Sequence, residues 1–309
     1  MLAPVAQLDR ALPSEGRGHR FKSYRVRQHA ILKKLQEHRV KLFRRKSAAV
    51  LIFLLLLPTT THAEQFSPTI ASTSLCGDSY LLALAPDHIS ALSWQSRSPL
   101  SLANKSQSEL PQLWDDPEVL MSTNADIILF GAGEGKYASK LKTKSVKLTW
   151  GEDFSNIQGN AKLITEALNI NSRVVENWTK RMANLKSRAE ARAAKPKVLY
   201  LSRSGGSAGR GTLVDAAITA AGGVNVVTRA GWFTPGPEHI ISYEPDLIIT
   251  SYFKNGYESV QSTGVRNKVV QRYIARHPNV EIDGKLWPCA GPGLIDAAEQ
   301  ISDAIDKLP

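Results

Sequence analysis

The sequence predicts an α/β protein that consists of two similar lobes joined by one long helix. Strands alternate with helices both before and after the middle of the chain, which is typical of parallel sheets. A 24-residue stretch without Gly or Pro, residues 171–194, interrupts this alternation. A short motif also occurs twice, once on each side of that stretch, and such repeats indicate duplicated architecture. The expected divisions are an N-terminal lobe over 64–168, a connecting helix over 169–195 and a C-terminal lobe over 196–309.

The repeated motif is a Trp, then a Glu, then, eight residues after the Glu, an Asp that opens an apolar run. Its members are Trp114, Glu118 and Asp126 in the first copy and Trp232, Glu238 and Asp246 in the second. The apolar runs that follow are 127–130 and 247–250. The repeat predicts that each lobe presents a Trp and a Glu at the same structural position.

The N-terminal half contains four predicted strands and four predicted helices. Asp116 precedes Pro117 at an expected helix start, because Asp caps helices and Pro is tolerated at the first helical position. A glycine-rich segment, Gly131–Gly135, follows one strand. The predicted strands are 67–75, 89–94, 127–130 and 146–150, and the predicted helices are 77–84, the one beginning after Asp116, 137–142 and 157–168.

The long stretch over 171–194 predicts a helix of ~36 Å. One apolar face carries Val174, Val175, Trp178, Met182 and Leu185 at helical spacing, so Trp178 is expected to pack internally. Lys195-Pro196 ends the pattern. A rigid connector between two lobes is the preferred interpretation, and an ordinary crossover helix within one large sheet is the alternative.

The C-terminal half repeats the strand–helix alternation. A Gly/Ser/Arg loop over 202–211 follows the first strand, and an amphipathic helix closes the chain. Asp283-Gly284 lies between two short apolar runs, 280–282 and 285–287, and predicts a hairpin. The predicted strands are 198–201 and 247–250, and the helices are 213–221, the one beginning at Pro237, 266–275 and 294–308.

The positive charge of the chain is concentrated at its N-terminus. Of the formal net charge of +11, residues 1–63 carry +10 and the other 246 residues carry +1. Nucleic-acid binding is therefore not expected of the remainder. Residues 40–63 predict a signal peptide, with a cationic start, an apolar stretch over 48–57 and a cleavage site near Ala63. A short membrane anchor is the alternative, although the apolar stretch is shorter than the ~20 residues that span a bilayer.

Residues 1–39 are interpreted as an upstream extension that does not fold. Residues 4–28 resemble the peptide obtained by translating through a bacterial tRNA gene, which implies a translation start placed too far upstream. An Arg-rich disordered arm is the alternative interpretation.

The two cysteines, Cys76 and Cys289, predict one disulfide in an exported protein. Such a bridge closes a very long loop and is worth ~4 to 5 kcal/mol in the chain-entropy treatment. Two buried free thiols, or thiols that contact a ligand, are the alternatives.

Candidate ligand-binding residues lie where strands end, because ligands of open α/β sheets bind beyond the carboxyl ends of the strands. Aromatic side chains offer stiff apolar faces, and arginine recognises anionic oxygens. Core packing remains the alternative for any single Trp. The candidates are Trp94, Trp114, Trp150, Trp232, Arg203, Arg210 and Tyr252, with Gly131–Gly135 and Trp287 at similar positions.

Two other function classes have some support. Ser207 stands in a G-x-S-x-G pattern, followed by Asp246 and His277 in hydrolase order, which suggests an exported serine hydrolase. The glycine-rich loop continues to Gly211, however, and that does not suit a tight nucleophile elbow. A receptor for a bare transition metal would need clustered ligands, and the histidines after residue 63 are scattered at His88, His239 and His277. We therefore expect no catalytic residue, no metal ligand and no cofactor.

Four features together resemble one known family. They are the segments Ser74–Ala85 and Ile89–Trp94, the twin Glu…Asp motif and the long middle helix, and the resemblance covers roughly residues 67–308. The family comprises the periplasmic substrate-binding proteins of ABC importers for iron chelates and vitamin B12. The resemblance implies a monomeric, non-enzymatic receptor that binds a ferric siderophore, haem or cobalamin between two lobes.

The resemblance also implies roles for particular residues. Glu118 and Glu238 would dock onto arginines of the ABC permease, which works with its ATPase in the inner membrane. Trp94, Trp114 and Trp232 match aromatics that line the cleft of the vitamin B12 binder. Ordinary first-turn carboxylates, which favour helix N-termini, are the alternative for the two glutamates.

Overall fold

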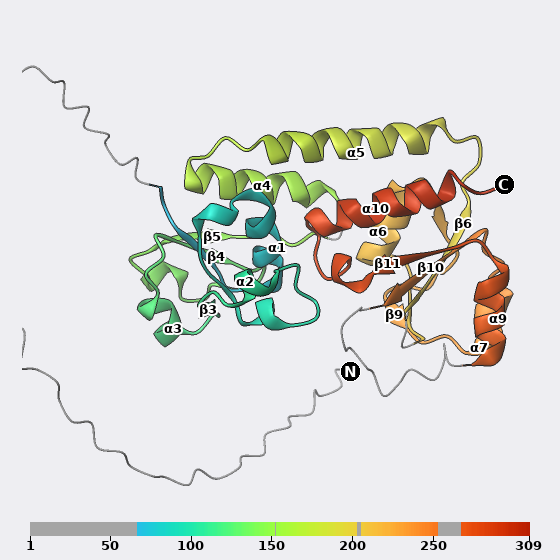
Figure 1. Ribbon diagram of the computed structural model, residues 1–309, viewed down its shortest axis with the longest axis horizontal. Coiled ribbons are helices and arrows are strands. Elements are labelled where there is room, and N and C mark those ends of the chain that lie inside the picture. Colours follow the sequence, from blue (N-terminus) through green and yellow to red (C-terminus); the bar gives the residue numbers. More distant parts are fainter. Residues whose placement is uncertain (1–66, 152, 203–204, 253–266) are drawn as a thin grey trace, which may run out of the picture. The chain divides into compact units, whose positions relative to one another are not determined.

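A computed structural model describes residues 67–151, 153–202, 205–252 and 267–309 (Figure 1). Glu64–Pro309 forms one compact unit. Its strands form two separate parallel sheets, one from each half of the chain, and a small antiparallel pair. The predicted two-lobed α/β class is confirmed. Within the described residues, no helix combines the length and the apolarity needed to cross a membrane.

The N-terminal lobe has a five-stranded sheet in the order β3-β2-β1-β4-β5, with every pair parallel. The strands are β1 (Ile70–Ser72), β2 (Ile89–Ser93), β3 (Gln112–Leu113), β4 (Ile127–Phe130) and β5 (Lys144–Lys147). The helices are α1 (Leu75–Leu84), α2 (Lys105–Ser108), α3 (Pro117–Ser122) and α4 (Ser155–Leu168), with 3-10 turns η1 (Pro86–His88), η2 (Trp94–Arg97) and η3 (Ala138–Lys140).

The C-terminal lobe has a four-stranded parallel sheet in the order β11-β10-β6-β8. Its strands are β6 (Lys197–Ser202), β8 (Val224–Asn225), β10 (Leu247–Tyr252) and β11 (Asn279–Asp283), and β7 (Ser207–Ala208) pairs antiparallel with β9 (Trp232–Phe233). The helices are α6 (Leu213–Ala220), α7 (Pro237–Ser242), α9 (Lys268–Arg276) and α10 (Pro292–Ile305), with a 3-10 turn η4 (Gly284–Leu286).

The central strands are apolar on both faces because helices cover both faces of each sheet. In β4, Ile127 and Leu129 join a core that extends through both lobes, while Ile128 and Phe130 face a smaller cluster under α3. In β6, Val198 and Tyr200 likewise join the shared core, while Leu199 and Leu201 face a cluster under α7 and α9. The shared core includes residues of α4, α5 and α10, so the lobes are packed together rather than simply tethered.

Helix α5 (Arg173–Ala191) connects the two lobes and runs beside α4 and α10 (Figure 1). It buries Trp178 and Leu185 against the shared core, as its apolar face predicts. Arg181 pairs with Asp296 and Glu299 of α10, both at 2.5 Å. Because the sheets are separate, the alternative of a crossover helix within one large sheet is wrong.

The duplicated motif has a structural counterpart. An Asp at the start of a central strand accepts a backbone hydrogen bond from the neighbouring strand in each lobe. Asp126 accepts from the Thr69 amide at 2.8 Å, and Asp246 accepts from the Lys197 amide at 2.7 Å. The two sheets also share the strand order β2-β1-β4-β5 and β8-β6-β10-β11. The hydrogen bonds from Thr69 lower the pKa of the Asp126 carboxyl, and the one from the Thr69 amide has the largest effect.

Four local predictions are wrong. The strand expected over 67–75 is limited to β1 (Ile70–Ser72), and Leu75 already begins α1. The hairpin at Asp283-Gly284 does not form: β11 pairs in parallel with β10, and Asp283 caps η4 by accepting from the Lys285 amide at 3.1 Å. The strand expected over 146–150 ends at Lys147, which leaves Trp150 in a loop. The helix expected over 137–142 is only the 3-10 turn η3.

Candidate ligand-binding cleft

A cavity of about 410 Å³ lies between the two lobes. Its N-terminal wall follows the carboxyl ends of β1, β4 and β5, and includes the start of α1, the Gly131–Glu134 loop, the Leu148–Gly151 loop, Gln95, Leu100 and Asn160. The C-terminal lobe contributes Leu213 and Pro288–Ala290. This is the position that the parallel sheet predicts for a ligand.

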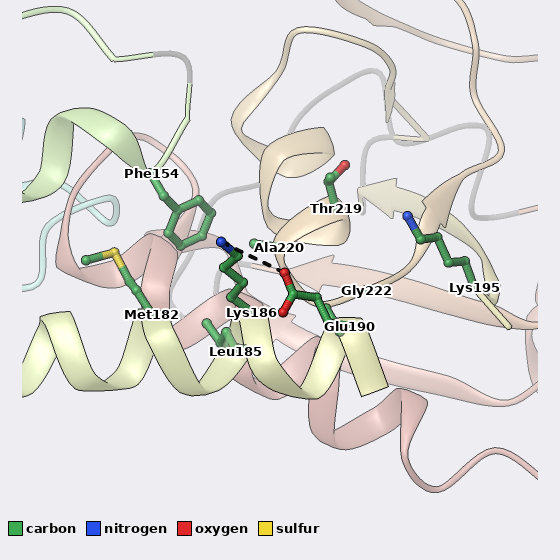
Figure 2. A pocket seen from close by; sticks show the side chains of 10 residues that line it. Phe154, Met182, Leu185, Lys186, Glu190, Lys195, Thr219, Ala220 and Gly222 are labelled. Atoms are coloured by element: carbon green, nitrogen blue, oxygen red, sulfur yellow. Dashed lines mark ion pairs between the residues drawn. The ribbon is translucent and has the colours of Figure 1, made fainter. Parts of the chain in front are cut away.

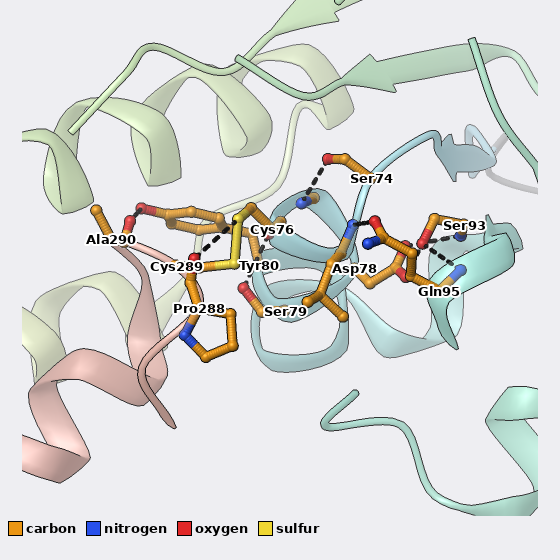
Figure 3. The surroundings of a disulfide bond; sticks show 12 residues. Ser74, Cys76, Asp78, Ser79, Tyr80, Ser93, Gln95, Pro288, Cys289 and Ala290 are labelled. Carbon is orange, nitrogen blue, oxygen red and sulfur yellow. Dashed lines mark hydrogen bonds between the residues drawn. A yellow bond between two sulfur atoms is a disulfide. The ribbon is translucent and has the colours of Figure 1, made fainter. Parts of the chain in front are cut away.

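Cys76 and Cys289 both line the cavity and form the predicted disulfide, with a Cα–Cα distance of 5.4 Å (Figure 3). The bridge joins α1 of one lobe to the segment before α10 of the other. Next to it, the Tyr80 hydroxyl donates to the Ala290 carbonyl at 2.9 Å, and the Tyr80 ring packs edge-on against Trp178 of α5. Burial raises the pKa of Tyr80. Both lobes and the connecting helix therefore meet at one side of the cavity.

A buried carboxylate in α1 fixes the segment that carries Trp94. Asp78 is only 1% exposed and accepts from the Ser93 amide at 2.9 Å and the Ser93 hydroxyl at 2.6 Å (Figure 3). Burial raises the pKa of Asp78 to about 6, against the lowering effect of those hydrogen bonds. Gln95, which lines the cavity, accepts from the Leu75 amide at 3.2 Å. The first turn of α1 thus orients residues 93–95.

Trp150 is the predicted tryptophan that lines the cavity, and 76% of its surface is exposed. Residues of α4 hold its loop. The Asn160 side chain accepts from the Thr149 amide and hydroxyl, both at 2.9 Å, and Asn156 donates to the Trp150 carbonyl. A preorganised, exposed aromatic face of this kind suits a flat or bulky ligand.

The other predicted tryptophans are exposed outside the cavity. Trp94 and Trp114 directly follow Ser93 and Leu113, which are paired in register, so they leave adjacent strand ends together. Trp232 packs edge-on against Tyr200 with a centroid distance of 5.8 Å and keeps more than half its surface exposed.

Trp287, in contrast, is buried and donates to the Ser251 hydroxyl at 2.9 Å. A strand-end position in the sequence therefore does not by itself distinguish a cavity-lining tryptophan from one that packs.

Among the predicted polar contacts, Arg210 is exposed, does not line the cavity, and donates to the Thr228 carbonyl at 2.7 Å. Arg203 and the side chain of Tyr252 lie outside the described residues. Glu134 and Asn160 line the cavity but were not predicted as site residues. Glu134 belongs to the glycine-rich segment at a strand end, which was the only local signal for it.

Glu118 and Glu238 have matching environments. Each is exposed and follows a Pro in the first turn of a short helix, α3 or α7. Two residues later, Leu120 and Ile240 are buried against the outer face of their lobe's sheet. The structure thus gives both glutamates the same local position, and their docking role remains a prediction.

The serine hydrolase hypothesis does not fit the structure. Ser207 is fully buried, and its hydroxyl donates to the Tyr200 carbonyl at 2.6 Å. It also lies in β7, which pairs antiparallel with β9, rather than at a strand-turn-helix elbow.

The three histidines of the bare-metal hypothesis belong to separate elements. His88 ends η1, His239 lies in α7 and His277 follows α9. Within the described residues, no group of three His, Cys, Asp or Glu side chains is placed to hold a metal ion.

A second hollow, of about 310 Å³, lies along α5 (Figure 2). Phe154, Met182 and Leu185 form much of its apolar lining, and the exposed pair Lys186 and Glu190, 3.9 Å apart, borders it. None of the predicted ligand-binding residues lines this hollow, so the 410 Å³ cavity is the candidate site.

No protein-family model matches the sequence, and no curated protein matches it. Solved structures, in contrast, match its two-lobed fold. The periplasmic haem-binding protein RhuT from Roseiflexus sp. RS-1 is 20% identical with a TM-score of 0.56, covering 77% of this chain and 99% of that chain. The periplasmic vitamin B12 binding protein BtuF of Vibrio cholerae is 18% identical with a TM-score of 0.54, covering 77% of this chain and 96% of that chain.

A periplasmic solute-binding protein from Veillonella parvula is 18% identical with a TM-score of 0.58, covering 77% of this chain and 80% of that chain. The chain therefore has the two-lobed fold of periplasmic substrate-binding proteins, as the sequence resemblance implied.

Proposed function

We propose that residues 64–309 form a periplasmic receptor that binds a metal chelate in the inter-lobe cavity and delivers it to an ABC importer. The chelate is a ferric siderophore, haem or cobalamin, and the receptor performs no chemistry on it. The observation that carries the proposal is the cavity between the lobes, lined by Trp150 and by both halves of the disulfide. Proteins of the same fold that bind haem and vitamin B12 support it.

Chelate binding is tested by quenching of intrinsic tryptophan fluorescence. Cyanocobalamin, haem and a panel of ferric siderophores are titrated into the purified protein at micromolar concentration. We expect one class to quench, and Trp150→Ala to weaken its binding about tenfold, since a buried aromatic contact is worth roughly 1 kcal/mol or more. Met121→Ala, which removes an exposed apolar side chain of α3, is the matched control. Absence of quenching by every chelate would contradict the proposed ligand class.

We expect only a small change in lobe separation on binding. The shared core, the disulfide and the contacts of α5 hold the lobes together, unlike lobes that move about a flexible hinge. Small-angle scattering of the free and chelate-bound protein should give nearly equal radii of gyration. A large compaction on binding would contradict a stiff receptor.

Delivery would use Glu118 and Glu238 as docking points, one on each lobe. Complementary charge pairs between protein surfaces steer encounter and fix register. Charge reversal, Glu118→Lys or Glu238→Lys, should lower chelate uptake by source cells at least tenfold without changing chelate affinity. Glu166→Lys, at an exposed position of α4, is the control. Normal uptake by cells that carry both Glu118→Lys and Glu238→Lys in one protein would exclude this docking surface.

Export to the periplasm would depend on residues 40–63, with cleavage near Ala63. Mass spectrometry of the protein recovered from the periplasm should give a chain that begins at Glu64. A chain that retains the apolar stretch 48–57 would favour the membrane-anchor alternative.

A further inference from the structure

Glu134 is the one side chain with a formal charge at neutral pH among the described residues that line the inter-lobe cavity. The rest of that lining is apolar, amide, hydroxyl or backbone, together with the disulfide. Within the described part of the chain, no Lys or Arg lines the cavity to neutralise it. The charge at this wall is therefore negative.

The Glu134 carboxylate is held in place by its own lobe. Its Oε2 atom accepts from the Gly131 amide at 2.8 Å and from the Thr73 hydroxyl at 2.5 Å. Thr73 is itself buried and also contacts the Leu129 carbonyl at 3.2 Å, so its position is fixed by β4. The side chain consequently does not need to order itself when a ligand arrives.

Part of the acceptor capacity of this carboxylate remains unused. A carboxylate offers about four lone-pair sites on its two oxygens. Both hydrogen bonds above go to Oε2, and no described residue donates to Oε1. Hydrogen bonds to an ionised acceptor are roughly twice as strong as neutral ones. The cavity wall therefore presents a fixed, strong acceptor.

A second carboxylate reinforces the negative field. Asp78 is buried in α1, and the negative charge of Glu134 contributes to raising its pKa, after the larger effect of burial. The two acidic groups are thus close enough to interact electrostatically. An anionic group that lost its water beside Glu134 would meet repulsion strengthened by the lower dielectric of the cavity.

We propose that Glu134 is the specificity-determining residue of the cleft, and that it selects chelates which present amide N–H or ammonium donors over chelates which present carboxylates or phenolates. This inference rests on the proposed function and deepens it. A neutral chelate with peripheral primary amides would donate to Oε1 while its flat face contacts Trp150. A chelate with anionic edge groups would place a negative charge next to the negatively charged carboxylate of Glu134.

The test compares three probes by equilibrium titration: cyanocobalamin, which carries amides, haem, which carries two propionates, and an anionic ferric tris-catecholate. The wild type should bind the amide-bearing probe most tightly. Glu134→Gln keeps the shape and an acceptor for the Gly131 amide. It should weaken binding of the amide-bearing probe about tenfold and leave binding of the anionic probes equal or tighter. Glu118→Gln, outside the cavity, should change none of the three.

Tighter wild-type binding of an anionic probe than of the amide-bearing probe would overturn the inference. An equal change for all three probes in Glu134→Gln would overturn it too. If Glu134→Gln does not fold, the inference is tested by the salt dependence of probe affinity in the wild-type protein. Affinity for an anionic probe should rise between low and high ionic strength because salt screens repulsion, and a fall would contradict the inference. Failure of every probe to bind the wild type would instead contradict the proposed function.

Discussion

The two lobes share a scaffold but differ at the cavity. Both place a parallel sheet between covering helices, anchor a central strand with Asp126 or Asp246, and expose a glutamate in a short helix. At the cavity, however, the N-terminal lobe supplies Trp150 and Glu134, whereas the described C-terminal contribution is Leu213 and Pro288–Ala290. The two lobes therefore share the elements of the scaffold, including the positions of the proposed docking glutamates, and specificity is expected to reside mainly in the N-terminal wall.

The lobes also differ in how they hold the connecting helix. α5 is bound to the C-terminal lobe by the ion pairs of Arg181 and Arg188, and Arg192, directly after the helix, forms another. The N-terminal lobe meets the same helix through packing of α4 and through the Tyr80–Trp178 contact. The disulfide adds a covalent link between the two lobes to this shared packing.

The largest expected effect comes from removing this bridge. The double substitution Cys76→Ser with Cys289→Ser should lower the free energy of unfolding by about 4 kcal/mol, since the bridge closes a loop with a sequence separation of 213. Urea unfolding measures the change, and reduction of the wild type should reproduce it. A loss below about 1 kcal/mol would show that packing alone holds the lobes together.

A smaller effect is expected from Asp78 of α1 in the N-terminal lobe, which should make the stability of the protein depend on pH. The pKa of Asp78 is raised from 3.8 to about 6 by burial, so the folded protein holds this proton more tightly than the unfolded chain does. Stability contributed by Asp78 is therefore present at low pH and is lost as the pH rises through about 6. Asp78→Asn should gain stability relative to the wild type as the pH rises from 4 to 7, by roughly 2 to 3 kcal/mol.

Thermal unfolding at several pH values measures this difference. Asp87→Asn, at an exposed position of η1, should follow the wild type. A constant offset between Asp78→Asn and the wild type at every pH would mean that Asp78 does not titrate in this window.

The smallest expected effect tests the symmetry of the scaffold. Asp126→Ala and Asp246→Ala should each cost about 1 kcal/mol, because each removes exposed hydrogen bonds to the backbone of the adjacent strand. The two values should agree within about 0.5 kcal/mol in urea unfolding. A clear cost in one lobe and none in the other would show that the repeated motif has different roles.

The fold can be predicted from the sequence because helix caps and apolar runs, which involve only neighbouring residues, define its helices and strands. Asp116 and Pro117 start α3 through contacts within a few residues, and the apolar runs form central strands that are buried on both faces. The site is harder to predict because distant segments create it. Asn156 and Asn160 of α4 fix the Trp150 loop, and Pro288–Ala290 reaches the cavity from near the end of the chain.

The wrong hairpin at Asp283-Gly284 has a similar cause. The Asp-Gly pair favours a tight turn locally, but pairing of β11 with β10 across a long sequence separation takes precedence. Glu134 was missed for a related reason, since only its hydrogen bonds to Thr73 and Gly131 reveal a fixed carboxylate.

The most direct test of the account is the position of the metal in a crystal of the protein with its bound chelate, located by anomalous scattering from cobalt or iron. We predict a single strong peak in the 410 Å³ cavity, between Trp150 and Pro288–Ala290. A peak in the hollow along α5, or one on the outer surface of a lobe, would contradict the central claim that the two lobes form a chelate receptor between them.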